Sequence, residues 1–86
     1  MPDTTKTRYV HDVHRSRNAV TTSLGARIRK LRERKRINQS EFAEYLGMNR
    51  GHLSDIELGK REARLLTLQA IAYGLDMTMS ALLRGL

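Results

Sequence analysis

Cysteine is absent from this chain of 86 residues, which excludes disulfide bonds, thiol catalysis and cysteine-based zinc sites. No apolar run approaches the roughly 18 residues of a membrane span, and the polar N-terminus lacks a signal-peptide core. We therefore expect a cytoplasmic protein with no membrane partner. Alternating runs of β-branched or aromatic residues, which are typical of strands, are also missing. The sequence predicts an all-α fold.

The sequence also lacks the residue groupings of an active site. There is no glycine loop of the kind that cradles phosphates, no nucleophile paired with a base, and no carboxylate pair in an apolar setting. His11 and His14 are spaced to share a helical face, but no third ligand accompanies them. We expect no enzymatic activity, no metal site, no cofactor and no small-molecule ligand.

Basic residues are in excess, and one segment holds most of the excess. Sixteen lysines and arginines against nine acidic residues give a net charge of +7. Residues 24–36 contain seven basic residues and one acidic residue, a net charge of +6, whereas residues 37–86 have a net charge of −1. A near-neutral body with one cationic end indicates a polyanionic partner met in a fixed orientation. On charge alone, a cationic helix that serves only solubility explains the pattern equally well.

Hydrophobic spacing predicts a flexible basic arm over residues 1–22 and a helical domain over residues 23–86. In the first helix, Leu24, Ile28 and Leu31 share one face, with Ser23 as the cap, and the helix fades near residues 36–37. A capping box, with Asn38 as the cap and a glutamate three residues later, opens a second helix that runs to about residue 46.

Three more helices are predicted after residue 48. Asn49 is placed to cap a third helix over residues 50–58, and a glycine follows each of the second and third helices. Thr78 is placed to cap a fifth helix. The apolar face of the fourth helix, which is amphipathic and should turn this face inward, is Leu65, Leu68, Ile71, Ala72 and Leu75, and the fifth helix carries Met79, Leu82 and Leu83.

Residues 39–58 form a unit that predicts a helix-turn-helix. Ala43 is small where the second helix must cross closely, and Gly47 stands where a tight turn needs positive φ. A generic helical hairpin also needs apolar spacing and a glycine. It does not need a small residue, a turn glycine and five apolar residues all at the fixed positions relative to one another that a helix-turn-helix requires. The five apolar positions are Phe42, Leu46, Met48, Leu53 and Ile56.

Two stretches carry a family resemblance, IRKLRERKRINQSEFAEYLGMNRGHLSDIELGK over residues 28–60 and LLTLQAIAYGLDMTMSALL over residues 65–83. They resemble the Xre-type family of lambdoid phage repressors and their Cro partners. The run NRGHLSDIELGKRE is most similar to restriction–modification controller proteins. The resemblance implies a lambda-repressor-like domain of five helices that binds partly palindromic double-stranded DNA as a homodimer.

The resemblance also implies roles for individual residues. It places Arg32 and Glu57 in a structural ion pair between the first helix and the end of the third. The implied base contacts are Asn49, Arg50, Gly51, His52 and Asp55. The implied phosphate contacts are Asn38, Gln39, Lys60 and Arg61.

Chemistry supports these roles unevenly. The fork of Arg50, at the tip of a helix in the groove, matches O6 and N7 of guanine, and a phosphate is its alternative partner. Gly51 offers no side chain, and His52 contacts a base, contacts a phosphate or lies at the interface. Asp55 either accepts a hydrogen bond from cytosine N4 or orients Arg50.

Apolar residues near the C-terminus predict the dimer interface. We expect Leu82 and Met79 to face the core, which leaves Leu83 and Leu86 to a partner. The alternative is a monomer that pairs only on DNA.

The sequence as a whole predicts a transcriptional regulator, repressing rather than activating. The other candidate is an antitoxin-type interaction module whose DNA binding is secondary. A nonspecific nucleic-acid binder is disfavoured by the acidic Asp55.

Overall fold

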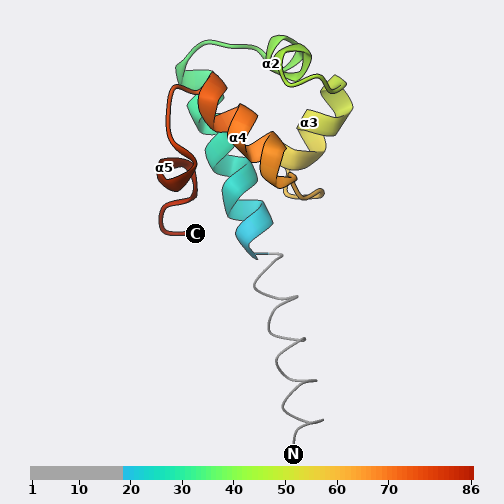
Figure 1. Ribbon diagram of the computed structural model, residues 1–86. Helices are drawn as coiled ribbons and strands as arrows, with labels where there is room; N and C mark the ends of the chain where they lie inside the picture. The colour runs from blue at the N-terminus through green and yellow to red at the C-terminus, as the bar shows by residue number, and fades with distance from the viewer. Residues whose placement is uncertain (1–18) are drawn as a thin grey trace, which may run out of the picture.

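The computed structural model describes residues 19–86, and helices are the only regular secondary structure among them (Figure 1). The N-terminal helix occupies residues 19–34 of the described part. It is followed by α2 (Gln39–Tyr45), α3 (Arg50–Glu57), α4 (Leu65–Gly74) and α5 (Met79–Leu83). The prediction of an all-α domain with five helices is confirmed. None of the helices in residues 19–86 has the length and apolar character needed to span a bilayer.

Local signals set most of the helix boundaries. The Asn38 side chain accepts a hydrogen bond from the Glu41 amide at 2.8 Å, and the Glu41 carboxylate accepts one from the Asn38 amide at 3.0 Å. This is the predicted capping box. Thr78 caps α5 through a 3.0 Å bond from the Ala81 amide. Gly47 ends α2 with a φ of +71°, as the turn prediction requires.

The first helix begins earlier than predicted. Residues 19–22, assigned to the arm by the sequence, are helical, and Ser23 lies exposed within the helix instead of capping it. The turn after α3 packs against this extension, since a Cβ added at Gly59 would lie 2.7 Å from the Thr22 Cα. A contact between segments so far apart in the chain cannot be recognised from the local sequence pattern. The rest of the predicted arm, including His11 and His14, lies outside the described residues.

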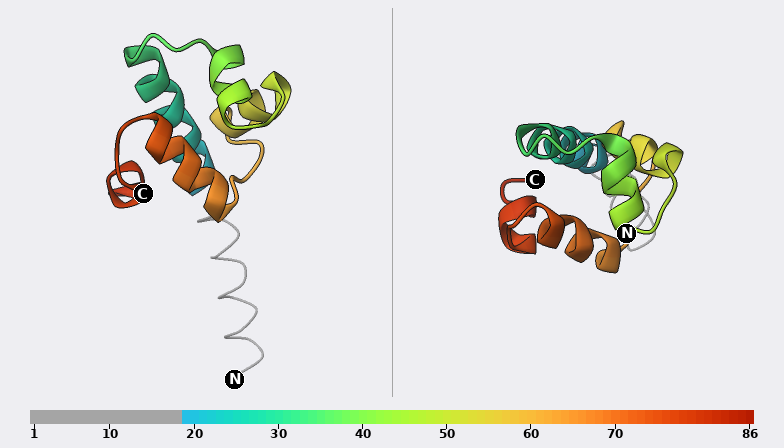
Figure 2. Two further views of the ribbon diagram at one scale, coloured as in Figure 1. Left: turned by 45° about the horizontal axis from the view of Figure 1, so that its top comes forward. Right: turned by 90° about the horizontal axis from the view of Figure 1, so that it is seen from above.

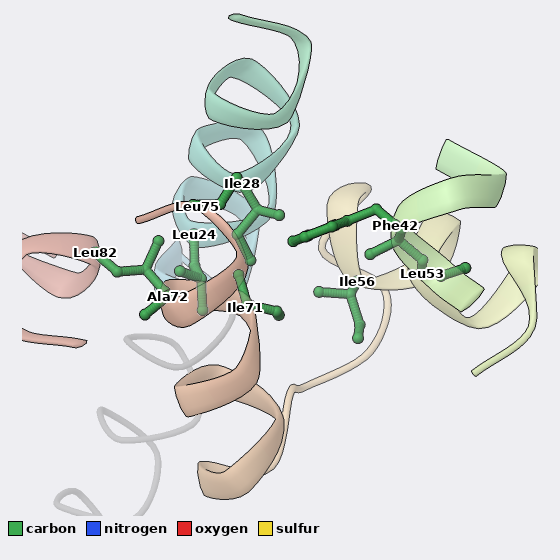
Figure 3. Packing of buried hydrophobic residues seen from close by; sticks show 10 residues of the cluster. Leu24, Ile28, Phe42, Leu53, Ile56, Ile71, Ala72, Leu75 and Leu82 are labelled. Atoms are coloured by element: carbon green, nitrogen blue, oxygen red, sulfur yellow. The ribbon is translucent and has the colours of Figure 1, made fainter. Parts of the chain in front are cut away.

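One hydrophobic core joins all five helices (Figure 3). The ring of Phe42 points from α2 toward Ile28 of the N-terminal helix, and both side chains are fully buried. Seen from above, α2 and α3 lie at one end of the domain and α5 lies at the other (Figure 2, right). The buried apolar side chains are Leu24, Ile28, Phe42, Ala43, Leu53, Ile56, Ile71, Ala72, Leu75 and Leu82.

The prediction that Leu65 faces inward is wrong, because this side chain is 68% exposed. Leu65 is the first residue of α4, and the contacts of this helix with the core begin at Leu68 and continue at Ile71 and Ala72. The neighbouring Leu66 is 74% exposed, and Tyr73 near the end of the same helix is 70% exposed. The outer side of α4 is therefore more apolar than the predicted amphipathic pattern implies.

Candidate nucleic-acid interface

The turn between α2 and α3 holds the start of α3 at the surface. The Met48 amide donates to the Ala43 carbonyl at 3.0 Å, which closes the turn on α2. Asn49 caps α3, since its side chain accepts a 2.7 Å hydrogen bond from the His52 amide. Leu53 of α3 is fully buried. With its inner face anchored in this way, α3 leaves Asn49, Arg50 and Gly51 exposed to a partner, and His52 and Asp55 partly exposed.

Arg32 and Glu57 form a buried ion pair between the N-terminal helix and the end of α3. The Arg32 Nε donates to Glu57 Oε2 at 2.7 Å, and a terminal nitrogen of Arg32 donates to Oε1 at 3.0 Å. Arg32 is 6% exposed and Glu57 is 5% exposed. The hydrogen bond with Glu57 raises the pKa of the Arg32 guanidinium above its ordinary value, although burial acts in the opposite direction.

A chain of hydrogen bonds leads from this buried pair to the surface. The side-chain amide of Gln39 donates to Glu57 Oε1 at 3.0 Å. The Nε of Arg50 in turn donates to the Gln39 side-chain oxygen at 3.2 Å. Arg50 is exposed, but Gln39 of α2 ties its side chain to the rest of the domain.

One of the two expected roles of Asp55 was to orient Arg50, but the two side chains are not bonded to each other in the free protein. Its carboxylate lies 3.9 Å from a terminal nitrogen of Arg61, and the hydrogen bond of Arg50 goes to Gln39 instead. Both Asp55 and Arg61 are about half exposed. The contact therefore joins α3 to the loop that precedes α4, where Lys60 is also exposed.

A polar hollow of about 300 Å³ lies on the side of α3 that faces the N-terminal helix. Arg29, Gln39, Arg50 and Ser54 line it, with the Arg32–Glu57 pair at its margin. Sequence reasoning missed Arg29 and Ser54. Helical spacing gives a signal for both, since Arg29 precedes Arg32 by three residues and Ser54 follows Arg50 by four.

A second hollow, of about 870 Å³, lies between the α2–α3 turn and the start of α4. Asn49, His52, Arg61 and Arg64 are among its lining residues. Arginines thus border both hollows, one on each side of the exposed start of α3. A helix flanked by two cationic hollows is suited to an extended polyanion that passes along both of its sides.

Gly51 lies exposed in the first turn of α3. A Cβ added there would meet only the Asn49 side-chain oxygen, at 3.4 Å. Nothing within residues 19–86 therefore demands a glycine at this position. Any need for the small residue must come from a partner that approaches the helix closely.

The C-terminal residues differ in how far they are available to a partner. Leu83 is partly buried and packs against the core, whereas Leu86 is 37% exposed. A terminal nitrogen of Arg27, in the N-terminal helix, donates to the Leu82 carbonyl at 2.8 Å and to the Arg84 carbonyl at 2.7 Å. Arg27 thus fixes the end of α5, another contact that the sequence did not indicate.

Acidic and histidine side chains do not gather into a metal site in the described part of the chain. No group of three or more potential ligands occurs there. The site residues that the structure brings together are instead Arg32, Gln39, Arg50 and Glu57.

Comparisons with known proteins identify the family of this chain. Residues 28–82 match the helix-turn-helix family. The control protein C.MunI from a Mycoplasma species is 36% identical over 66 residues, which cover 76% of this chain and 89% of that protein. Two proteins of Bacillus phage phi105 also match. The ImmF control region 10 kDa protein is 41% identical over 59 residues, covering 69% of this chain and 66% of its own length. The immunity repressor protein is 33% identical over 60 residues, covering 70% of this chain and 42% of its own length.

Among solved structures, the restriction–modification controller protein C.AhdI from Aeromonas hydrophila superposes with a TM-score of 0.71 at 29% identity. The match covers 76% of this chain and 94% of that structure. The residues that match the family, 28–82, include the capped α2, the turn at Gly47 and the whole of α3. The chain therefore belongs to the Xre-type helix-turn-helix family of DNA-binding transcription regulators.

Proposed function

We propose that this regulator binds a partly palindromic operator as a homodimer, with α3 in the major groove of each half-site. The observation that carries the proposal is the exposed start of α3, braced by the hydrogen-bond chain from Arg32 to Arg50 and flanked by arginines on both sides. Repression is the proposed effect, since one similar protein is an immunity repressor. The similar proteins come from a bacterium and a bacteriophage, and bacterial DNA lies in the cytoplasm, so we also propose a cytoplasmic location.

Arg50 is the principal base-reading residue in this proposal. Its hydrogen bond to Gln39 uses Nε, so the two terminal nitrogens are left to bond O6 and N7 of guanine. The bond to Gln39 also limits the positions that the guanidinium can occupy before DNA arrives. Asn49, Gly51, His52 and Asp55 complete the proposed base-contacting surface.

Residues on both sides of α3 are proposed to hold the two phosphate strands that border the groove. Asn38 and Gln39 lie at the start of α2, and Lys60 and Arg61 lie in the loop before α4. Arg29 joins the first group through the smaller hollow. Contacts of this kind set the register of the protein on the duplex but carry no direct sequence information.

Replacing Arg50 by alanine is expected to weaken specific binding by about 1–3 kcal/mol and to relax the preference at one base pair per half-site. Site selection from a random duplex library with purified protein measures the base preference, and a binding titration on the selected operator measures the loss of affinity. Lys60→Ala is the control, because loss of a phosphate contact weakens binding to all sequences alike. If the Arg50→Ala protein selects sites with the same preference at every position, Arg50 does not read a base.

Leu83 and Leu86 are proposed to form the dimer interface, at the end of the domain opposite α2 and α3 (Figure 2). Leu83 also packs on the core, so Leu86→Glu is the cleaner test. We expect this substitution to shift micromolar protein from dimer toward monomer in sedimentation equilibrium without DNA. Leu66→Glu is the matched control, since Leu66 is the more exposed leucine at 74%. Dissociation by Leu66→Glu alone would move the interface to α4, and a wild-type monomer would exclude a preformed dimer.

The exposed apolar side chains of α4 favour a second candidate function, an antitoxin-type module that binds a protein. Leu65, Leu66 and Tyr73 offer such a partner an apolar surface on one helix. DNA binding would then be secondary. The neighbouring reading frame discriminates between the two functions, because a toxin gene favours the module and a restriction enzyme or phage gene favours the regulator.

A further inference from the structure

Four helices within residues 19–86 end in the same hydrogen-bonded turn, and two of the four turns hold a residue other than glycine at the position that glycine favours. In each, the second residue after the helix takes positive φ, and the amide of the next residue donates to a carbonyl five residues earlier, which is the Schellman motif. Glycine is the usual residue at this position because it has no Cβ. The four residues found there are Arg36, Gly47, Gly59 and Asp76.

Asp76, one of the two residues other than glycine, has a visible reason for its place. Its φ is +57°, and its carboxylate accepts a 2.8 Å hydrogen bond from Lys35 Nζ. This ion pair ties the turn after α4 to the end of the N-terminal helix. Aspartate is also among the residues that tolerate the left-handed conformation best.

Arg36 has no comparable partner within residues 19–86. Its φ is +59°, and its side chain is exposed. Its amide donates to the Glu33 carbonyl at 2.9 Å, so the turn itself is well formed. Arg36 thus occupies a position where the backbone favours glycine, and its long side chain has no partner within residues 19–86. A strained backbone position of this kind points to a functional requirement for the side chain.

The position of Arg36 relates it to the DNA-binding face. It lies two residues before Asn38, which caps α2. A terminal nitrogen of Arg32 donates to the carbonyl of the intervening Ile37 at 2.8 Å. The buried ion pair that braces α3 therefore also fixes the turn that carries Arg36.

We propose that Arg36 binds a phosphate of the DNA backbone, next to the phosphate held by the start of α2. The proposal rests on the proposed function, because it extends the contact of Asn38 and Gln39 outward along the same strand. A phosphate contact accounts for a flexible cation at a position where glycine is the more stable residue. The competing explanation is a favourable interaction of the cation with the negative end of the N-terminal helix.

Arg36→Gly separates the two explanations because they predict opposite changes in stability. We expect the melting temperature to rise by about 2–4 °C, since relief of the left-handed strain exceeds the entropy lost by a glycine on folding. We expect operator affinity to fall by about three- to tenfold, and the slope of log affinity against log salt concentration to become shallower by about one. Base preferences should not change.

Two control variants and two duplexes complete the experiment. Arg34→Ala removes the same charge from an exposed position at the end of the N-terminal helix, and Asp76→Gly changes the other turn that holds a residue other than glycine at positive φ. A lower melting temperature for Arg36→Gly, or a loss of affinity no larger than that of Arg34→Ala, would overturn the proposal. Each protein is measured on a selected operator and on a random-sequence duplex. Equal wild-type affinity for the two would refute the proposed function, while the change in salt slope on either duplex still tests Arg36.

Discussion

The Glu57→Ala protein is expected to lose about 3–5 kcal/mol of its free energy of unfolding. The substitution leaves the Arg32 guanidinium buried without its counter-charge, and it removes the acceptor of the Gln39 amide. Thermal and urea unfolding of the free protein measure the loss before any DNA is added. Removing one partner of a buried ion pair lowers the free energy of unfolding more than replacing both partners by apolar residues. The double variant Arg32→Met, Glu57→Leu should therefore be more stable than Glu57→Ala.

The control for this prediction is the exposed pair of Arg29 and Glu33. Their side chains lie 3.2 Å apart, and each is more than half exposed. Glu33→Ala should therefore change stability by no more than about 1 kcal/mol. An unchanged melting curve for Glu57→Ala together with weakened DNA binding would contradict the prediction and would move Glu57 from structure to recognition.

Replacing Gly25 by alanine is expected to destabilise the fold by about 3 kcal/mol, at the upper end of the usual range for overpacking. The N-terminal helix crosses the end of α3 so closely at Gly25 that an added Cβ would lie 2.3 Å from the Ile56 carbonyl oxygen. The same Cβ would lie 2.6 Å from the Glu57 carbonyl oxygen. Both obstacles are backbone atoms, so a change of side-chain rotamer does not relieve the overlap. Urea unfolding measures the loss.

A matched substitution in α3 should act in the opposite direction. Gly51 is also helical, but its added Cβ would meet nothing closer than 3.4 Å. Gly51→Ala is therefore expected to stabilise the free protein by about 0.5–1 kcal/mol through the higher helix propensity of alanine. Wild-type stability in the Gly25→Ala protein would show that the two helices separate at little cost.

Features that depend on a few neighbouring residues were predictable from the sequence. The capping box at Asn38, the caps at Asn49 and Thr78, and the left-handed glycine at position 47 each involve groups within a few residues of one another. Short-range chemistry of this kind is read directly from residue types. The spacing of the apolar residues predicted the order of the helices for the same reason.

Features that depend on distant segments were not predictable. The predicted first helix starts at Ser23, whereas residues 19–22 are also helical. No local pattern indicates that Gly59 packs against Thr22. The inward assignment of Leu65 assumed that α4 is covered from its first residue, which depends on where the other helices lie.

The residues of the candidate site were predictable from the sequence, but the hydrogen bonds that connect them were not. Arg32 and Glu57 came from the family resemblance, and their pairing is visible in the structure. The link through Gln39 to Arg50 joins residues of different helices, so it follows only from the fold. Asp55 illustrates the same limit, because its cationic neighbour is Arg61 of the following loop.

The N-terminal helix joins the two ends of the domain. Arg27 holds the carbonyls at the end of α5, and Arg32 holds Glu57 at the end of α3. These two arginines are five residues apart on one helix, a rise of about 7.5 Å. In a dimer built on α5, this helix would connect the symmetry axis to α3 in each subunit. Because a helix is rigid and no loop lies in this connection, the distance between the two copies of α3 would be fixed. Such a dimer would bind only operators whose two half-sites have the matching separation.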